Sequence, residues 1–253
     1  MAGTPMYLRI ADQLRDQIRS GDLAPGSQLP GETELMALHQ ASRNTIRSAL
    51  KLLAHEGLLI ADRGRGTFVR EVYKPVMWDW STMESRSRHV ADGNGNDQWA
   101  TSVLAAGRVP RQEITVSIVT PPPAIAETLG LDPIDGVAVL RHRLRLVDHE
   151  PHVISDSYFP AELVEGTLLM QPRDVSAPGG VLAAAGLIQA RYRDEIRVRM
   201  PTQSETQTLR LAAGTPVAEH TRTGYDENGR ALRAMVTILP GDRHVSTYDV
   251  HPD

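Results

Sequence analysis

Two groups of arginines in the first 70 residues have the type and spacing to hydrogen-bond to a nucleic acid. Arg43 and Arg47 are four residues apart, so on a helix their side chains would lie along one solvated face. An arginine can donate two hydrogen bonds to O6 and N7 of a guanine. In the run from Arg63 to Gly66, two glycines allow positive φ angles and a close approach to another molecule. These residues indicate a DNA-binding surface, although an ordinary solvated helix and turn would share each feature.

One helix and one hairpin must position these arginines, and the sequence predicts both. Ser42 is a good N-cap, and a left-handed residue at Gly57 would end the helix. The apolar stripe of this helix consists of Ile46, Ala49, Leu50 and Leu53. Residues 58–60 and 67–69 then form two short strands with the arginine–glycine run at their tip. This pattern is typical of a winged helix-turn-helix, whose helix enters the major groove and whose wing reaches phosphates or the minor groove.

Two further helices precede the basic one. Residues 6–20 carry apolar side chains at helical spacing, and a second helix is predicted from Glu32 to about His39, with a tight connection at residues 40 and 41. Residues 6–70 as a whole resemble the N-terminal domain of the GntR family of bacterial transcription regulators. The motifs that carry the resemblance are IADQLRDQIRSGDLAPGSQLPGETEL, SRNTIRSALKLLAHEGLL and GRGTFV. One departure is Gly31, where the family commonly has a serine that caps the second helix.

The resemblance implies a role for individual residues. Arg43 and Arg47 match the arginines of the family's recognition helix, and Arg63 and Gly64 match the wing-tip pair that the family places in the minor groove. Hydroxyl groups near the helix starts and the remaining wing arginine would contact phosphates. The complete set of predicted DNA-binding residues is Thr33, Ser42, Arg43, Thr45, Arg47, Arg63, Gly64, Arg65 and Gly66.

Length and composition indicate two domains, because 253 residues are enough for two separate cores. Residues 1–70 hold nine Lys and Arg against seven Asp and Glu, whereas the remainder holds 18 against 24. The positive charge is therefore local to the first part. The chain has no cysteine, no secretory signal pattern and no apolar run near the roughly 18 residues of a membrane span. We expect a cytoplasmic protein with no membrane partner and no cofactor.

The pattern turns β-rich after residue 108. Residues 137–147 alternate apolar and basic side chains, and residues 152–159 return antiparallel after a turn. Strands in hairpins mixed with helices predict an α+β domain around an antiparallel sheet with flanking helices. The expected organisation is a DNA-binding domain over residues 1–70, a linker over 71–97, and a second domain over 98–253.

Residues 108–250 resemble the effector-binding UTRA domain of the HutC subfamily, whose fold is similar to chorismate lyase. The residues that carry this resemblance are Arg143 to Arg145, Asp148 to Pro151, Tyr158 to Pro160, Gly214 to Val217, Asp226 to Gly229 and Gly241 to Arg243. The resemblance implies that a small molecule binds this domain and that two chains dimerise through it.

Strand alternation puts Arg141, Arg143 and Arg145 on one face, where their charges would repel unless an anion or carboxylates lie among them. We therefore expect an anionic ligand, phosphorylated or carboxylated, bound by Arg143 and Arg145; a sheet face balanced by Glu150, Asp156 or Glu195 is the alternative. UTRA relatives that bind sugar phosphates have glutamates at the positions of Ser155 and Arg233 and a tyrosine at that of Leu239, so the sugar side differs here. The predicted effector residues are Arg143, Arg145, Ser155, Ser157, Tyr158 and Arg233.

Neither a metal site nor a catalytic site is expected. His142, His149 and His152 lack a further ligand set, and the sequence has no nucleophile elbow, phosphate-binding loop or zinc-binding histidine pair on a helix. The sequence thus predicts a regulator, most simply a repressor, that binds a palindromic operator as a homodimer and responds to a small metabolite. The alternatives are a constitutive DNA-binding regulator whose second domain only dimerises, or an enzyme on a chorismate-lyase-like fold.

Overall fold

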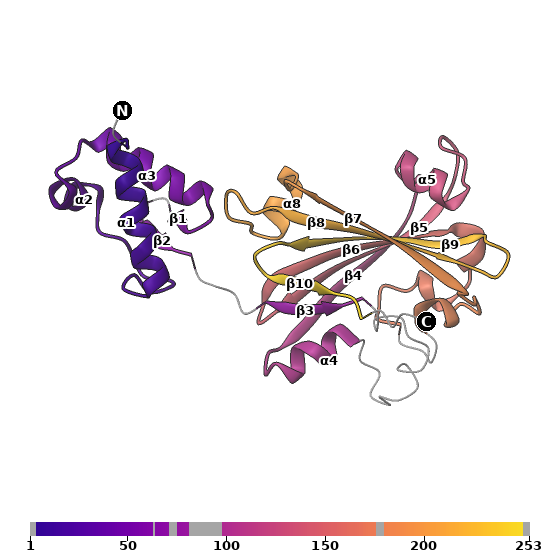
Figure 1. Cartoon of the computed structure of the whole chain (residues 1–253). Helices are drawn as coiled ribbons and strands as arrows, with labels where there is room; N and C mark the ends of the chain where they lie inside the picture. Colours follow the sequence, from indigo (N-terminus) through magenta and orange to yellow (C-terminus); the bar gives the residue numbers. More distant parts are fainter. Residues whose placement is uncertain (1–3, 63, 71–74, 81–97, 176–179, 250–253) are drawn as a thin grey trace. The chain divides into compact units, whose positions relative to one another are not determined.

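The computed structural model describes residues 4–62, 64–70, 75–80, 98–175 and 180–249. The chain divides into two compact units, one holding residues 1–74 with 211–215 and the other residues 75–210 with 216–253. Each unit has its own helices and its own sheet (Figure 1).

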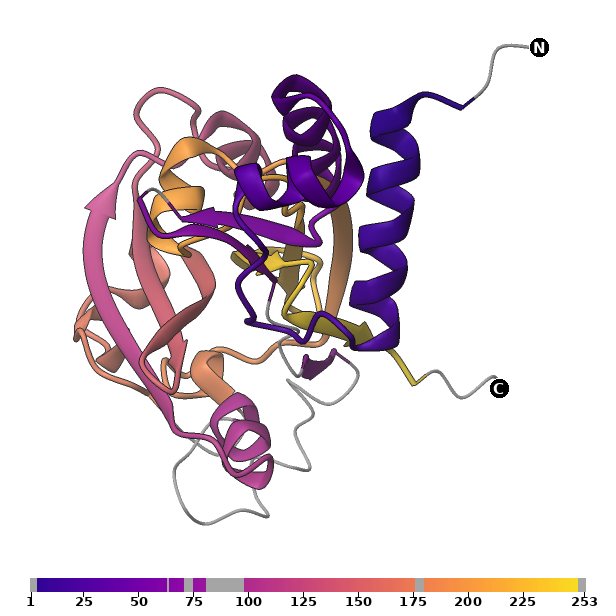
Figure 2. The same cartoon turned by 90° about the vertical axis from the view of Figure 1, so that its left-hand side faces the viewer.

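The first unit consists of three helices and a hairpin, which confirms the predicted elements. Helix α1 spans Met6–Ser20, α2 spans Glu32–His39 and α3 spans Arg43–His55. Strands β1 (Leu59–Asp62) and β2 (Gly66–Val69) pair antiparallel, and the hairpin lies against the helices (Figures 1 and 2). This is a winged helix-turn-helix.

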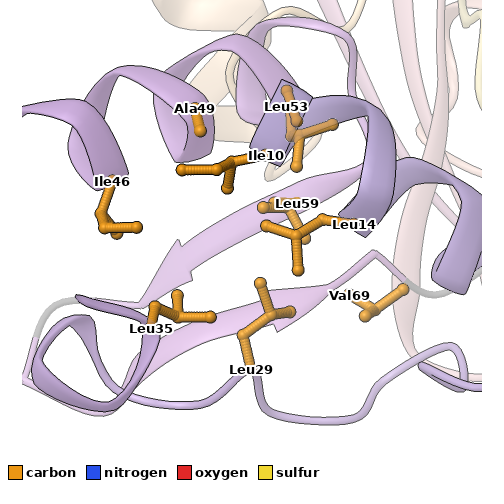
Figure 3. Close-up of a cluster of buried hydrophobic side chains, with 10 residues drawn as sticks. Ile10, Leu14, Leu29, Leu35, Ile46, Ala49, Leu53, Leu59 and Val69 are labelled. Atoms are coloured by element: carbon orange, nitrogen blue, oxygen red, sulfur yellow. The ribbon is translucent and has the colours of Figure 1, made fainter. Parts of the chain in front are cut away.

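The helices and the hairpin of this unit enclose a single apolar core (Figure 3). Its members are at most 4% exposed, and they come from all three helices, both strands and the turn before α2. They are Ile10, Ala11, Leu14, Leu29, Leu35, Ile46, Ala49, Leu53, Leu59 and Val69. Each large aliphatic side chain buried in this way contributes roughly 1.5–3 kcal/mol. The core therefore fixes the recognition helix against its two neighbours.

The second unit is built on a six-stranded antiparallel sheet in the order β4-β5-β6-β9-β8-β7. The strands are β4 (Pro110–Val119), β5 (Ala138–Val147), β6 (Glu150–Pro160), β7 (Arg191–Arg199), β8 (Val217–Tyr225) and β9 (Ala231–Pro240). Asp148 and His149 have φ angles of 52° and 70°, which suit the tight turn between β5 and β6. The α+β class predicted from the alternating pattern is confirmed.

Helices and a short second ladder cover the two faces of this sheet. Helix α5 (Pro123–Leu129) packs on one face, against Tyr158 of β6 and Ala234 of β9. On the other side, β3 (Val76–Asp79) runs parallel to β10 (His244–Thr247), and α4 (Gln98–Ala105) packs with them. The remaining helices are α6 (Ala161–Val164), a 3-10 turn (Leu168–Met170), α7 (Gly180–Ala183) and α8 (Gln203–Thr208).

The predicted linker over 71–97 is wrong for residues 76–80. Trp78 and Trp80 are 3% and 0% exposed and belong to a core of the second unit with Trp99 and Val153. Burial of two indole rings draws this segment into the domain. Residues 71–74 and 81–97 of the predicted linker lie outside those that the structure describes.

None of the helices in the described part of the chain is both long enough and apolar enough to cross a membrane.

Candidate DNA-binding and effector sites

The two arginines predicted to read DNA lie together on the exposed side of α3. The side chains of Arg43 and Arg47 are 58% and 61% exposed. Arg47 donates from Nε to Oε1 of Glu32 at 2.8 Å, and Nε of Arg43 lies 3.8 Å from Oε2 of the same carboxylate. Hydrogen bonding from Arg47 lowers the pKa of Glu32. Glu32 is the first residue of α2, so this carboxylate joins the two helices of the motif.

The predicted phosphate-binding hydroxyls lie at the N-terminal ends of α2 and α3. Ser42 Oγ accepts from the backbone N–H of Thr45 at 3.2 Å and lies 2.8 Å from the Thr45 hydroxyl, which confirms Ser42 as the N-cap. Thr33 and Ser42 are exposed and Thr45 is half-buried. A helix N-terminus is a favourable place for a phosphate, because its backbone N–H groups and its dipole both attract an anion.

Of the two arginines predicted at the tip of the wing, Arg65 is among the residues that the structure describes. Arg65 is 76% exposed, is paired with Asp62 at 2.9 Å, and lies over the ring of Phe68. Gly64 and Gly66 have φ angles of 84° and 119°, as the predicted tip requires. Arg63, the other predicted wing arginine, lies outside the described residues.

Sequence reasoning missed a residue that holds the wing. Gln28 donates from Nε2 to the carbonyl oxygen of Arg65 at 2.7 Å. A Cβ at Gly66 would lie 2.6 Å from Nε2 of Gln28, so a side chain there would displace this contact. No local sequence pattern indicated this contact, because Gln28 lies 37 residues before Arg65.

The arginines of β5 share one face of the sheet, as predicted, but their environments differ. Arg141 is 3% exposed and donates to the carbonyl oxygens of Leu169, Gln171 and Arg173 at 2.6–2.8 Å. Burial lowers the pKa of Arg141 to about 10. Arg141 thus fastens the segment after the 3-10 turn to the sheet.

Arg145 and Arg143 lie further along the same face. Arg145 is 8% exposed, and its guanidinium lies 4.9 Å from the ring centre of Trp99 and 5.3 Å from that of Trp78. Arg143 lies 3.4 Å from Asp174, which also accepts from Gln112 at 2.8 Å. The sequence predicted that an anion would offset the repulsion between these arginines. In the structure, cation–π contacts of Arg145 and the carboxylate beside Arg143 contribute to this offset.

The alternative prediction, that Glu150, Asp156 or Glu195 balances the arginines of β5, is wrong, because each of these carboxylates pairs with another residue. Glu150 pairs with Arg210, Asp156 with His142 at 2.6 Å, and Glu195 with Arg193 at 2.8 Å. Asp156 is directly opposite His142 in the β5–β6 register, on the face away from Arg143. Asp174 was missed because it lies in a loop 31 residues beyond Arg143.

The structure brings some of the predicted effector residues together and separates others. Ser155 and Ser157 are opposite Arg143 and Arg141 in the register, and Ser155 Oγ lies 3.1 Å from Thr237 Oγ1. Alternation along β9 puts Arg233, which is 3% exposed, on the face of Thr237. Tyr158 does not join them. It pairs with Leu140 and Ala234 and lies in the apolar core beneath α5, on the opposite face.

A charged aromatic cluster on the same polar face was not foreseen. Arg222 is fully buried and forms two bonds to Asp194 at 2.6 and 2.7 Å, and His220 Nε2 lies 3.0 Å from the same carboxylate. The ring centroids of His220 and Trp80 lie 3.5 Å apart. Burial opposes ionisation of Asp194, but the bonds from Arg222 and His220 outweigh it and hold its pKa far below the ordinary value. His220 is opposite Thr237, so the cluster adjoins Ser155.

Potential metal ligands do not gather in the described part of the chain, where no three His, Asp or Glu side chains form a cluster that could hold an ion. Burial lowers the pKa of His152 to about 3, so this histidine is neutral at physiological pH.

A winged helix-turn-helix is a DNA-binding module, and a chain that carries one together with a separate α+β unit has the architecture of a transcription regulator. Residues 6–69 match the model of the bacterial regulatory proteins of the gntR family, and residues 105–245 match the UTRA domain. The chain belongs to the GntR family, in its group with a UTRA effector-binding domain. The family and its relatives are transcription regulators and not enzymes.

Relatives match over almost the whole chain. The chain is 33% identical over 252 residues to the HTH-type transcriptional regulator SCO4628 of Streptomyces coelicolor, covering 97% of this chain and 92% of the relative. It is 30% identical over 241 residues to the HTH-type transcriptional repressor NagR of Bacillus subtilis, covering 95% and 92%.

Solved structures share the fold. A crystal structure of a GntR-family transcriptional regulator has a TM-score of 0.68 at 24% identity, with 99% of both chains covered. PhnF from Mycobacterium smegmatis has a TM-score of 0.56 at 21% identity, with 98% of this chain and 100% of that chain covered.

Proposed function

We propose that this regulator is a repressor that binds a palindromic operator as a homodimer and changes its DNA affinity when a small anionic metabolite binds the second unit. The observation that carries the proposal is the pair of exposed arginines, Arg43 and Arg47, gathered by Glu32 on the recognition helix. NagR of Bacillus subtilis is named a repressor, which supports the repressor role.

The geometry of the first unit supports the proposed DNA contact. Arg43 and Arg47 of α3 read base edges in the major groove, where a guanidinium can bond O6 and N7 of guanine. The hydroxyls at the helix N-termini bind phosphates and fix the register. They are Thr33, Ser42 and Thr45. The wing, with Arg63 to Gly66, contacts the minor groove or the adjacent backbone.

Two copies are needed for a palindromic operator. Two recognition helices related by a twofold axis meet half-sites about one helical turn apart, so the symmetry of the operator mirrors that of the protein. We place DNA binding in residues 1–70, and effector binding and dimerisation in residues 98–253 together with the strand at 76–79.

The effector site lies on the polar face of the large sheet, around Arg143. Arg143 is 19% exposed at its side chain and faces Ser155, and Asp174 lies 3.4 Å away on a loop. A carboxylate or phosphate of the ligand would replace Asp174 at the guanidinium. Ser157, Thr237 and Arg233 share this face, while Arg145 acts through its packing between Trp78 and Trp99.

One observation favours a second candidate, a constitutive regulator. Arg141 is held by three carbonyl oxygens, Arg145 by two indole rings and Arg143 by Asp174. The strand is therefore stable without an added anion, so its arginines alone do not demand a ligand.

Selection from a pool of randomised duplexes tests the DNA-binding part of the proposal. We expect enrichment of an inverted repeat whose half-sites are about 10 base pairs apart, or a multiple of that spacing. Enrichment of a single half-site would overturn the homodimer. Adding phosphorylated sugars and carboxylates to the selected duplex and measuring affinity then separates the two candidates, because a constitutive regulator would respond to none of them.

A further inference from the structure

Residues 26–29, between α1 and α2, lie along the edge of β2 that β1 does not cover. The backbone N–H of Val69 donates to the carbonyl oxygen of Ser27 at 2.8 Å, and the N–H of Leu29 donates to that of Thr67 at 2.8 Å. These two bonds pair the segment antiparallel with the second strand of the wing, although α2 and α3 separate the two in the sequence. The backbone of the wing is therefore held from both sides.

The side chain of Gln28 extends this pairing to the tip of the wing. Its Nε2 donates to the carbonyl oxygen of Arg65 at 2.7 Å, and the backbone N–H of Arg65 donates to the carbonyl oxygen of Asp62 at 3.0 Å. Arg65 is thus bonded to its own hairpin through one backbone group and to Gln28 through the other. The missing Cβ of Gly66 leaves the space that the amide of Gln28 occupies.

The same segment leads directly to the contact with the recognition helix. Leu29 is 4% exposed and lies in the apolar core (Figure 3), and Pro30, which follows it, has a φ angle restricted to about −65°. Two residues further on, Glu32 accepts the hydrogen bond from Arg47. A buried leucine and a proline therefore make a short, stiff connection between the wing contact of Gln28 and the helix contact of Glu32.

We propose that residues 26–32 set the position of the wing tip relative to the recognition helix, with Gln28 as the positioning residue for the wing. The inference rests on the wing contact of the proposed function and names the residue that fixes it. One duplex presents its base edges and its phosphates at set distances from each other. A wing tip already held at the matching distance loses less conformational freedom when DNA binds.

The chemistry of the Gln28 contact suits a positioning role. Gln28 bonds to the backbone of Arg65 and not to its guanidinium, which is 76% exposed. A neutral amide also leaves the charge of the DNA-facing surface unchanged. Removing the amide should therefore weaken the phosphate contact of Arg65 only through its position. The loss of one phosphate contact makes the dependence of log affinity on log salt concentration shallower by about one.

Gln28→Met in the full chain tests this role, because methionine keeps the length of the side chain and has no donor. Affinity for the duplex selected with the wild-type chain is measured over about 50–200 mM salt. We expect a loss of about threefold to tenfold, the change that corresponds to one ordinary hydrogen bond. The salt dependence should become shallower by about one. Base preference at the positions assigned to Arg43 and Arg47 should be retained.

Two further variants separate the contact from side effects of the substitution. Gln28→Asn, whose amide is one methylene shorter, should show the same loss as Gln28→Met. Gln13→Met makes the same substitution at an exposed glutamine of α1, and it should bind like the wild type. Because Gln28 is exposed, we expect the midpoint of thermal unfolding of Gln28→Met to stay within about 3 °C of the wild type.

A wild-type salt dependence in Gln28→Met, whatever its affinity, would show that Gln28 does not position the wing. Loss of base preference at the positions of Arg43 and Arg47 would mean that the substitution disturbs the whole domain, which would also overturn the proposal. If the wild-type chain itself selects no duplex, the DNA binding of the proposed function fails. That outcome is distinct from a wild-type chain that selects a duplex and a Gln28→Met variant that binds it identically.

Discussion

Arg47 and Glu32 are joined by a hydrogen bond of 2.8 Å from guanidinium Nε to carboxylate Oε1. The bond links the middle of the recognition helix to the first turn of the preceding helix, and Glu32 also draws in Arg43 at 3.8 Å. Because Nε is engaged, the two Nη groups of Arg47 are left for a base edge. The bond therefore holds the Arg47 side chain in one position on α3, which would favour the base contact we propose.

Arg47→Ala should weaken binding to the selected operator roughly tenfold or more, and it should relax base preference at one position in each half-site. The reason is the loss of bonds to a base edge, which a small side chain cannot replace. Titration of fluorescent duplexes, one operator and a set with each base substituted, measures both effects. Equal loss on every duplex would instead identify Arg47 as a phosphate contact.

Glu32→Gln separates positioning from charge. Glutamine keeps the size and one acceptor oxygen but removes a negative charge that repels phosphates. We expect affinity for unrelated DNA to rise and affinity for the operator to fall, so that the ratio of the two falls about threefold or more. Glu34→Gln, a carboxylate in the same first turn, is the matched control and should raise both affinities together. Parallel changes in the two variants would leave Glu32 no positioning role.

The DNA-binding half could be predicted from the sequence because its determinants are local. The N-cap at Ser42, the apolar stripes and the glycines of the wing act within a few residues of the arginines they position. The polar face of the second unit could be predicted only in part. Alternation put Arg141, Arg143 and Arg145 on one face, but Asp174 and the indole rings beside Arg145 come from distant segments.

Tyr158 shows the limit of motif matching. It follows Ser157 directly in the sequence and was assigned to the same pocket, but successive residues of a strand point to opposite faces. Burial beneath α5 decides its position, since Ala234 and Ile125 pack around it.

Arg143→Ala should abolish the response to an anionic effector and leave operator affinity unchanged. A ligand that binds only the folded state at 100 times its dissociation constant adds roughly 2.7 kcal/mol, so thermal unfolding against phosphorylated sugars and carboxylates detects it. Arg111→Ala, an exposed arginine on the neighbouring strand β4, is the control and should keep the full shift. A wild-type shift that survives in Arg143→Ala would place the ligand elsewhere, and hits confined to neutral compounds would contradict an anionic effector.

Asp194→Asn should destabilise the second unit by about 3–5 kcal/mol at neutral pH, because it leaves the fully buried Arg222 without its carboxylate. The folded-state pKa of Asp194 is lowered, so its contribution is present above the unfolded-state value of about 3.9 and is lost as the pH falls below it. The difference in unfolding free energy between wild type and variant should therefore be constant from pH 7 to about pH 5 and shrink below pH 4. Urea unfolding at a series of pH values measures this difference, with Glu113→Gln on β4 as a variant expected to change stability by less than about 0.5 kcal/mol. A difference that stays constant down to pH 2, or that grows with acid, would show that the Asp194 carboxylate is not the stabilising group.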